Sequence, residues 1–172
     1  MWIPGRRAFK DSDEAAIEPY IGALRRFAMG LCHDQSLADD LVQDCLERAI
    51  SRWHLRREDG NLKAWLFTIL HHEFINGRRR IARRGSVASL DDLTIEPAIQ
   101  PDQEDVLRVA DILAAVDRLA ADHRALILLI GVEEVSYEEA AQILGIPIGT
   151  VMSRLSRARE RLRRLLAGEA AA

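Results

Sequence analysis

The sequence has little of what would favour disulfide, sheet or metal-bound structure. Only two of its 172 residues are cysteine, Cys32 and Cys45, and they form no Cys-x-x-Cys pair. A disulfide framework or a zinc site therefore has little support, and we expect two buried free thiols. Proline is scarce, with 5 residues, while 48% of the residues are hydrophobic and 30% are charged. This balance favours helices and predicts an all-α fold.

Long apolar runs are also absent. The longest, residues 125–132, is far shorter than the roughly 18 residues that a bilayer-spanning helix needs. The N-terminus begins Met-Trp-Ile-Pro-Gly-Arg-Arg and then turns acidic, without the apolar core and cleavage site of a signal peptide. We therefore expect a soluble, cytoplasmic protein with no membrane insertion.

No catalytic constellation is recognisable in the chain. A nucleophile triad, a phosphate-binding loop and a cluster of metal ligands are all missing from the sequence, which predicts a protein that is not an enzyme and needs no cofactor. His71 and His72 are adjacent, but neighbouring helical residues point about 100° apart and chelate a metal poorly. A binding function is the remaining expectation.

Charge is segregated along the chain, although the net charge is only -3. Residues 1–85 hold 15 basic and 12 acidic side chains, residues 86–105 hold none and 6, and residues 106–172 hold 9 of each. Within the last part, residues 150–172 carry 6 arginines against 2 glutamates. Arginine clusters confined to part of a nearly neutral chain favour the binding of a polyanion at particular faces.

Helical periodicity divides the chain into two halves. Apolar residues three and four apart recur up to the arginine run that ends at Arg84, and they resume at Val106. Between these positions the periodicity disappears and every charge is negative. The sequence therefore predicts two small helical domains, residues 1–85 and 106–172, joined by a flexible acidic linker at residues 86–105.

Local signals predict where several helices begin. Pro19 fits only near the first turn of the first long helix. Ser36, with Asp39 three residues later, resembles a capping box, and Asn61 is placed to cap the next helix. In the second half we expect Asp122 or a neighbour to cap the apolar helix that follows it.

The stretch that begins at Ser136 has the pattern of a helix-turn-helix motif. Ser136 and Glu139 form a capping box, Ala141 is small where two helices must cross closely, Gly145 supplies the turn, and Val151 returns to the core. Because all these features occur in the required order, the pattern is far more specific than a lone glycine motif. It predicts a domain that reads DNA.

The helix after this turn carries two parallel stripes, one apolar and one of arginine. The arginines have few acidic residues nearby for pairing, so a merely solvated charged face is the weaker interpretation. The start of the helix would enter a major groove, and its later arginines would contact phosphates. The predicted duplex-contacting residues are Thr150, Ser153, Arg154, Ser156, Arg157 and Arg161.

Three stretches resemble the extracytoplasmic-function (ECF) sigma factors of the sigma-70 family. They are residues 37–50, residues 62–70 with the arginine run after them, and residues 146–159. They occur in the family's order and cover nearly all of residues 15–166. The resemblance implies an alternative sigma factor for promoter-specific transcription initiation, in a stress or envelope response. Its implied partners are promoter DNA, core RNA polymerase through the β′ clamp helices and the β flap, and an anti-sigma factor.

The resemblance also assigns roles to residues. The second domain would read the minus-thirty-five element as duplex, and the acidic segment would enter the polymerase channel or serve as a tether. The face implied to dock on the β′ clamp helices comprises Asp39, Asp40, Gln43, Asp44 and Glu47. The residues implied to capture the melted minus-ten strand are Asn61, Lys63, His71, His72, Asn76, Arg79 and Arg80.

Two residues depart from the family's pattern, and two other functions remain open. His72 stands where the family often has asparagine, and Met152 where it often has a cation, which leaves the base preference undetermined. An autonomous helix-turn-helix regulator that needs no polymerase is the main alternative. A third is an adaptor whose arginine faces bind an acidic protein.

Overall fold

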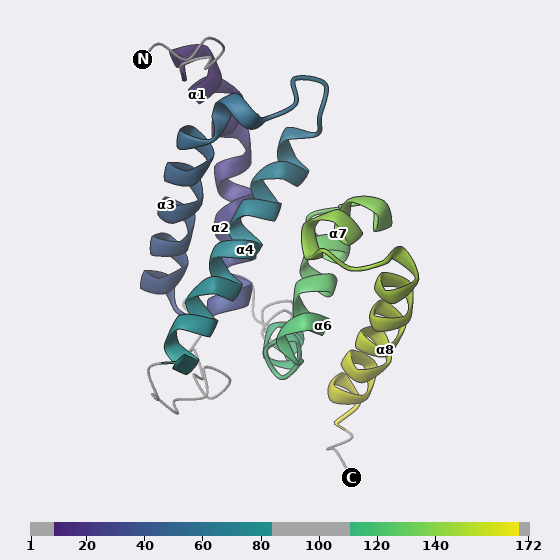
Figure 1. Cartoon of the computed structure of the whole chain (residues 1–172). Coiled ribbons are helices and arrows are strands. Elements are labelled where there is room, and N and C mark those ends of the chain that lie inside the picture. Colours follow the sequence, from purple (N-terminus) through teal and green to yellow (C-terminus); the bar gives the residue numbers. More distant parts are fainter. Residues whose placement is uncertain (1–8, 84–110, 169–172) are drawn as a thin grey trace, which may run out of the picture.

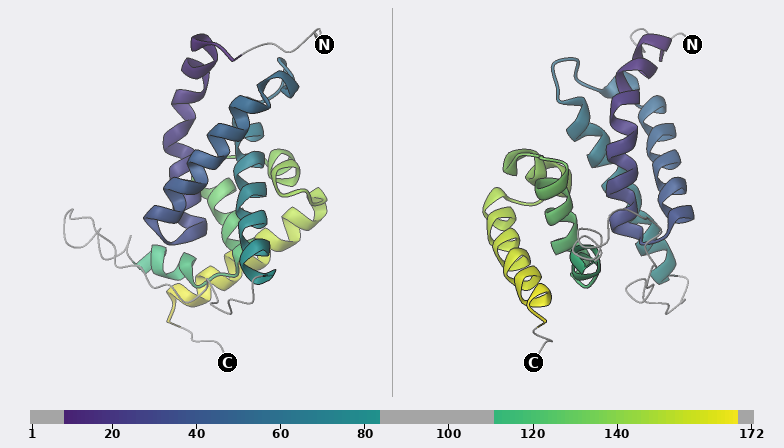
Figure 2. Two further views of the ribbon diagram at one scale, coloured as in Figure 1. Left: turned by 60° about the vertical axis from the view of Figure 1, so that its left-hand side comes forward. Right: turned by 180° about the vertical axis from the view of Figure 1, so that it is seen from behind.

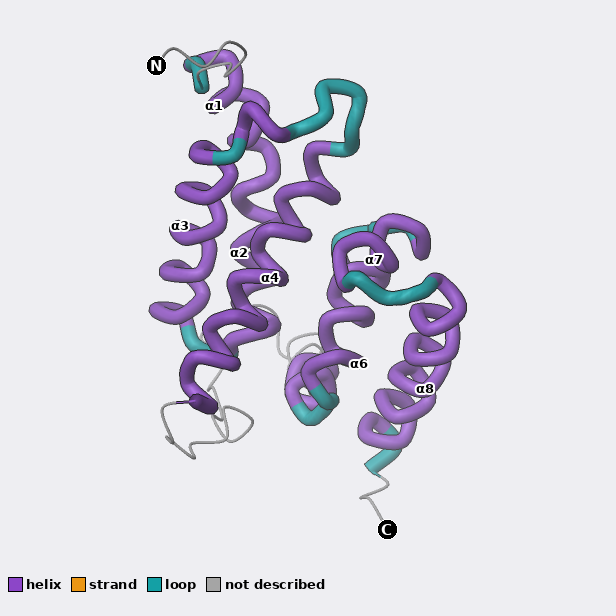
Figure 3. The backbone as a smooth tube through the Cα atoms, viewed as in Figure 1, coloured by secondary structure: helices purple, strands orange, loops and turns teal. Residues whose placement is uncertain are grey.

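The protein is all-helical, as the composition predicts. The computed structural model describes residues 9–83 and 111–168, and within these ranges it contains no strand (Figure 3). The predicted acidic linker lies outside the described residues. The first half comprises α1 (Asp11–Ile17), a 3-10 turn (Glu18–Tyr20), α2 (Ile21–Cys32), α3 (Gln35–Ser51), a second 3-10 turn (Trp53–Leu55) and α4 (Leu62–Arg83). The second half comprises helical residues 111–117, α6 (Ala121–Leu126), a π-helical segment (Ile127–Val132), α7 (Tyr137–Leu144) and α8 (Ile148–Leu166).

The helix starts of the first half differ in part from those predicted. Pro19 lies in the 3-10 turn between α1 and α2, since a proline in a helix interior would leave a carbonyl without its donor. The prediction that Ser36 caps α3 was wrong. Asp34 takes that place, because its extended backbone allows its side chain to accept a hydrogen bond from the Leu37 amide at 2.8 Å. Asn61 does cap α4, accepting a hydrogen bond from the Ala64 amide at 3.1 Å.

The second half starts differently from the prediction but contains the predicted helix-turn-helix. No side chain caps α6, whose N-cap is Ala120; the carboxylate of Asp122 instead pairs with a residue of α8. Ser136 and Glu139 exchange both hydrogen bonds of the capping box at the start of α7. Gly145 ends α7 with φ at +64°, a left-handed conformation that favours glycine.

The first half is built around α2, α3 and α4, which pack against one another (Figure 1). Phe27 of α2 and Phe67 of α4 are fully buried, with ring centroids 5.2 Å apart. Trp65 is half-buried and packs edge-on against the buried Trp53. Cys32 and Cys45 are buried free thiols, as predicted, and burial raises the pKa of Cys32 to about 11 and that of Cys45 to about 12.

The second half packs directly on the first, with α7 against α4 and α6 against α2 (Figures 1 and 2). A single cluster of buried side chains runs through both halves, from Phe27 and Leu70 to Leu129, Ile143 and Val151. The two predicted domains therefore share one hydrophobic core in this conformation. No described helix is long and apolar enough to cross a bilayer.

Candidate nucleic-acid interface

The turn at Gly145 directs α8 so that one face packs and the neighbouring face stays in solvent. Val151, Leu155 and Ala158 are at most 2% exposed, which confirms the predicted apolar stripe. Beside them on the same helix lie all six predicted duplex contacts. Thr150, Arg154 and Arg161 are half-buried and Ser153, Ser156 and Arg157 are exposed.

The arginines of α8 differ in how far they are already paired. Arg154 forms an ion pair with Asp122 of α6 at 2.9 Å. Glu160 pairs with Arg163 and Arg164, one turn further along α8. Arg157 and Arg161 have no acidic partner among the described residues. The middle of α8 therefore presents uncompensated positive charge, which suits phosphate or base-edge contacts.

The start of α8 offers both polar and apolar groups. The Ser153 hydroxyl donates a hydrogen bond to the Thr150 carbonyl at 3.2 Å and keeps its acceptor capacity free. Met152 is 50% exposed between them. An exposed methionine there can make apolar contact with a thymine methyl group, where a cation would bind phosphate.

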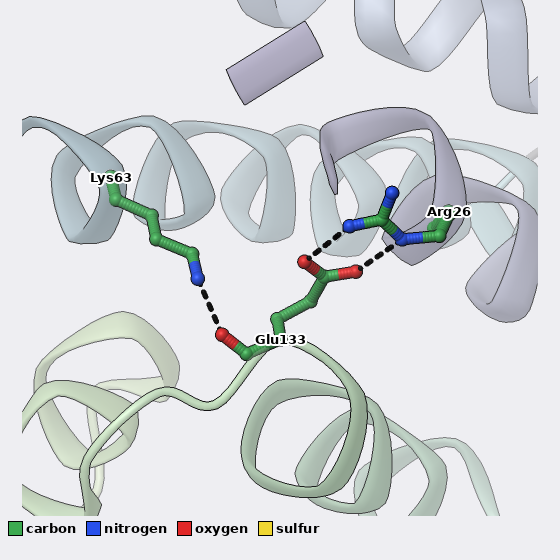
Figure 4. Close-up of polar contacts among 3 residues, drawn as sticks. All are labelled: Arg26, Lys63 and Glu133. Atoms are coloured by element: carbon green, nitrogen blue, oxygen red, sulfur yellow. Dashed lines mark hydrogen bonds and ion pairs between the residues drawn. The ribbon is translucent and has the colours of Figure 1, made fainter. Parts of the chain in front are cut away.

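Two of the predicted strand-capturing residues on the first half are already engaged by the second half. Asn61 uses its side-chain oxygen to cap α4, and its amide nitrogen donates a hydrogen bond to the Glu139 carboxylate. The Lys63 ammonium donates a hydrogen bond to the backbone carbonyl of Glu133 (Figure 4). Both groups are occupied in this conformation.

His71 is a poor cation in this structure. Its Nδ1 atom is buried and has no hydrogen-bond partner among the described residues. Burial lowers the pKa of His71 to about 4; the neighbouring His72 lowers it further, and Asp122 opposes this. His71 is therefore neutral near pH 7, and any contact it makes with DNA would be through a neutral imidazole.

The other predicted strand contacts lie together in solvent along α4. His72, Asn76, Arg79 and Arg80 are all exposed. A pocket of about 470 Å³ lies at the C-terminal part of α4 and is shared with α3. It is lined by Asp44, Arg48, Glu73, Asn76, Gly77, Arg80 and Arg83. The pocket brings predicted strand contacts next to a predicted polymerase contact.

The acidic face of α3 is exposed at all five predicted positions. Asp39 lies 3.7 Å from Arg25 of α2, and Gln43 donates a hydrogen bond to Glu47 at 3.0 Å. Asp40 and Asp44 form no ion pair with any described residue. Since both carboxylates point into solvent, this face can bind a basic partner surface without first breaking an internal pair.

Comparison with known proteins identifies the family. The family model for the Sigma2 domain of PhyR matches residues 17–71, and that for sigma-70 region 4 matches residues 110–162. The ECF RNA polymerase sigma factor EcfG of Rhodopseudomonas palustris is 40% identical over 147 residues, covering 85% of this chain and 80% of that relative. The chain belongs to the ECF sigma factor family.

Further relatives agree with this assignment. SigE of Mycolicibacterium smegmatis is 32% identical to this sigma factor, and the match covers 95% of this chain and 65% of SigE. Among solved structures, the sigma factor RpoE in complex with the anti-sigma factor NepR from Bartonella quintana has a TM-score of 0.78 and 41% identity. The match covers 94% of this chain and 100% of the RpoE chain. The protein is thus an alternative sigma factor, a transcription initiation factor.

Sequence reasoning missed the residues that join the two halves of the sigma factor. Arg26 of α2 forms a two-pronged ion pair with Glu133, and Glu139 has a contact with Asn61 besides its capping role. Asp117 lies 2.9 Å from the Nδ1 atom of the buried His33. These pairs are far apart in the sequence and follow no periodic pattern, so the sequence contained no signal for them.

Proposed function

We propose that promoter recognition is divided among three helices of this sigma factor. In this proposal α8 reads the minus-thirty-five element as duplex, while α4 and the turn before it capture the melted minus-ten strand. The acidic face of α3 docks on the β′ clamp helices of core RNA polymerase. The arginine face of α8, with Arg157 exposed and unpaired among the described residues beside the buried Val151 and Leu155, is the observation that carries the proposal.

The chemistry of α4 suits the capture of a single strand. Capture of single-stranded nucleic acid requires cations for the backbone and planar or polar groups for extruded bases. Arg79 and Arg80 supply exposed charge, and His72 and Asn76 supply planar groups with hydrogen-bonding capacity. No chemical reaction of the chain itself is required, so the protein acts as a binding factor rather than an enzyme.

Regulation by an anti-sigma factor is part of the proposal. The support is the similarity to RpoE of Bartonella quintana, which was solved in complex with the anti-sigma factor NepR. By the same analogy this sigma factor acts in the cytoplasm on core polymerase, in a stress or envelope response. The β flap is the proposed second docking site on the polymerase.

In vitro transcription tests the function as a whole. Purified core RNA polymerase is incubated with a genomic promoter library, with and without this chain, and the transcript starts are mapped. We expect defined starts that depend on the chain. Absence of promoter-specific initiation would refute the sigma-factor role. Tight duplex binding by a symmetric dimer without polymerase would favour the autonomous regulator instead.

Substitutions on α8 test the assignment of the duplex reader. Arg157→Ala removes an unpaired, exposed arginine, and we expect affinity for a minus-thirty-five duplex to fall about 5-fold or more. Arg163→Ala is the matched control, because Arg163 is already paired with Glu160 near the end of α8. It should change the affinity by less than about 2-fold. Equal losses in both variants would indicate nonspecific charge attraction and contradict the assignment.

A charge reversal on each half separates the two binding surfaces. Arg154→Glu should abolish duplex recognition and leave core polymerase binding intact. Asp44→Arg should weaken core binding, because it places a like charge opposite a basic partner surface. For both variants, fluorescence anisotropy with a labelled duplex measures DNA binding and a pull-down with core polymerase measures core binding. The opposite pattern would refute the domain assignment.

A further inference from the structure

Within the second half, α6 packs against α8 and places a carboxylate beside one arginine of the proposed duplex reader (Figure 1). Nη1 of Arg154 donates a hydrogen bond to Oδ2 of Asp122 at 2.9 Å. Buried neighbours fix both backbones, since Leu126 of α6 is 0% exposed and Leu155 of α8 is 2% exposed. The ion pair therefore holds the Arg154 guanidinium against a rigid part of the helix-turn-helix domain.

The ion pair contributes little to folding, because both of its side chains are in contact with water. The Arg154 side chain is 37% exposed and the Asp122 side chain 64% exposed, and pairs so exposed add little stability. Asp122 also uses only the Nη1 end of the guanidinium. Nε and Nη2 of Arg154 have no hydrogen-bond partner among the described residues. One edge of the guanidinium is thus held while the other edge remains available to a ligand.

The available edge has the geometry that reads guanine. Two parallel N–H groups of a guanidinium match the O6 and N7 acceptors that guanine presents in the major groove. An arginine that is free in solution loses side-chain freedom when it makes this contact, whereas one already held by a carboxylate loses less. Arg157, one turn further along α8, has no acidic partner among the described residues. Arg154 is therefore the arginine of this face that is prepared for one orientation.

From this geometry we propose that Asp122 is a positioning residue for base recognition. It acts through Arg154, which it holds so that the Nε and Nη2 edge reads one guanine of the minus-thirty-five duplex. The negative charge of Asp122 lowers the attraction of this surface for phosphates in general, so the residue favours selectivity over affinity. This inference rests on the proposed function, because it requires α8 to be the duplex reader.

The test measures base preference position by position, with the full-length chain bound to core RNA polymerase. A promoter mapped by in vitro transcription is randomised over its minus-thirty-five region, and the bound DNA is sequenced. The variants are Asp122→Ala, Asp122→Asn and Arg154→Ala. Glu160→Ala is the matched control, because it also removes an exposed carboxylate that pairs with arginine, here Arg163 and Arg164 near the end of α8. Far-UV circular dichroism checks that each variant is folded.

We expect the wild type to prefer guanine at one base pair by about 5-fold or more, and Arg154→Ala to lose that preference. Asp122→Ala should reduce the same preference about 3-fold or more and change those at the other base pairs by less than about 2-fold. Asp122→Asn keeps a hydrogen-bond acceptor, so it should lose less than Asp122→Ala. Glu160→Ala should leave every base preference unchanged.

Two results would overturn the positioning role and leave the duplex reader intact. One is a wild-type guanine preference in Asp122→Ala where Arg154→Ala has lost it. The other is a loss in Asp122→Ala that is equal at all base pairs, since this would indicate a structural role only. If Arg154→Ala changes no base preference, the assignment of α8 as the duplex reader is itself wrong, and the inference fails together with that part of the proposed function.

Discussion

At the scale of single residues, His71 makes stability depend on pH. Burial lowers its pKa in the folded chain from 6.5 to about 4, so the folded state keeps the imidazole neutral. The unfolded chain takes up a proton below about pH 6.5, and the free energy of unfolding then falls as the pH decreases. Between about pH 6.5 and 4 this one group contributes a slope of up to about 1.4 kcal/mol per pH unit.

Urea unfolding at about pH 7, 6 and 5 measures this slope. Other groups also titrate in this range, so the quantity of interest is the difference between wild type and His71→Leu. The variant has no imidazole to protonate and should lose less stability on acidification. If wild type and variant have the same slope, the proton uptake assigned to His71 is wrong.

At the scale of elements, the joint between α7 and α8 depends on one backbone conformation. Gly145 has φ at +64°, and a Cβ atom there would meet nothing within 4 Å. Gly145→Ala should therefore lower the free energy of unfolding of the protein by about 1–2 kcal/mol, through backbone strain alone. Gly149→Ala is the control, since residue 149 lies in α8, has the same open surroundings and does not have a left-handed conformation.

For Gly149→Ala we expect the free energy of unfolding to stay the same or to rise by up to about 1 kcal/mol, because alanine is the better helix former. Chemical denaturation followed by circular dichroism compares the two variants. Equal effects would mean that the left-handed turn does not set the stability of the helix-turn-helix.

Elements whose signals are local could be predicted from the sequence. Ser136, Glu139 and Gly145 act within a few residues of one another, so the capping box and the turn were confirmed. The start of α3 was placed wrongly because Asp34 and Ser36 are both good caps, and only backbone conformation chooses between them. The Arg26–Glu133 pair joins residues 107 apart, and a single sequence contains no information on such contacts.

At the scale of the whole molecule, the two halves are coupled by packing as well as by polar contacts. The face of α2 that bears Phe27 packs in the same cluster as Leu129 and Ile143 of the second half. The second half alone is small, and a small helical unit buries a thin core. In the conformation described here, much of the stability of the second half must therefore come from its contact with α2 and α4. The predicted domain boundaries stay a prediction, and they do not imply that the two halves unfold independently.

The distribution of tryptophan allows this coupling to be measured. Trp2, Trp53 and Trp65 all lie in the first half, so tryptophan fluorescence reports on that half, whereas far-UV circular dichroism reports on the helices of both. In wild type we expect the two signals to give the same urea midpoint, as in a two-state transition.

A Cβ atom at residue 30 of α2 would lie 2.5 Å from the Leu128 Cδ1 atom, so Leu128 must shift in Gly30→Ala and the interface between the halves is weakened. The second half should then unfold first. Gly22→Ala on the same helix is the control, because a Cβ atom there would meet only Arg26, at 3.8 Å. The circular dichroism midpoint should then fall about 0.5 M urea or more below the fluorescence midpoint, since a small protein loses about 1–3 kcal/mol of stability per molar urea. Gly22→Ala should keep the midpoints together. Coincident midpoints in Gly30→Ala would mean that this contact does not couple the halves, and separate midpoints in wild type would mean that they are not coupled at all.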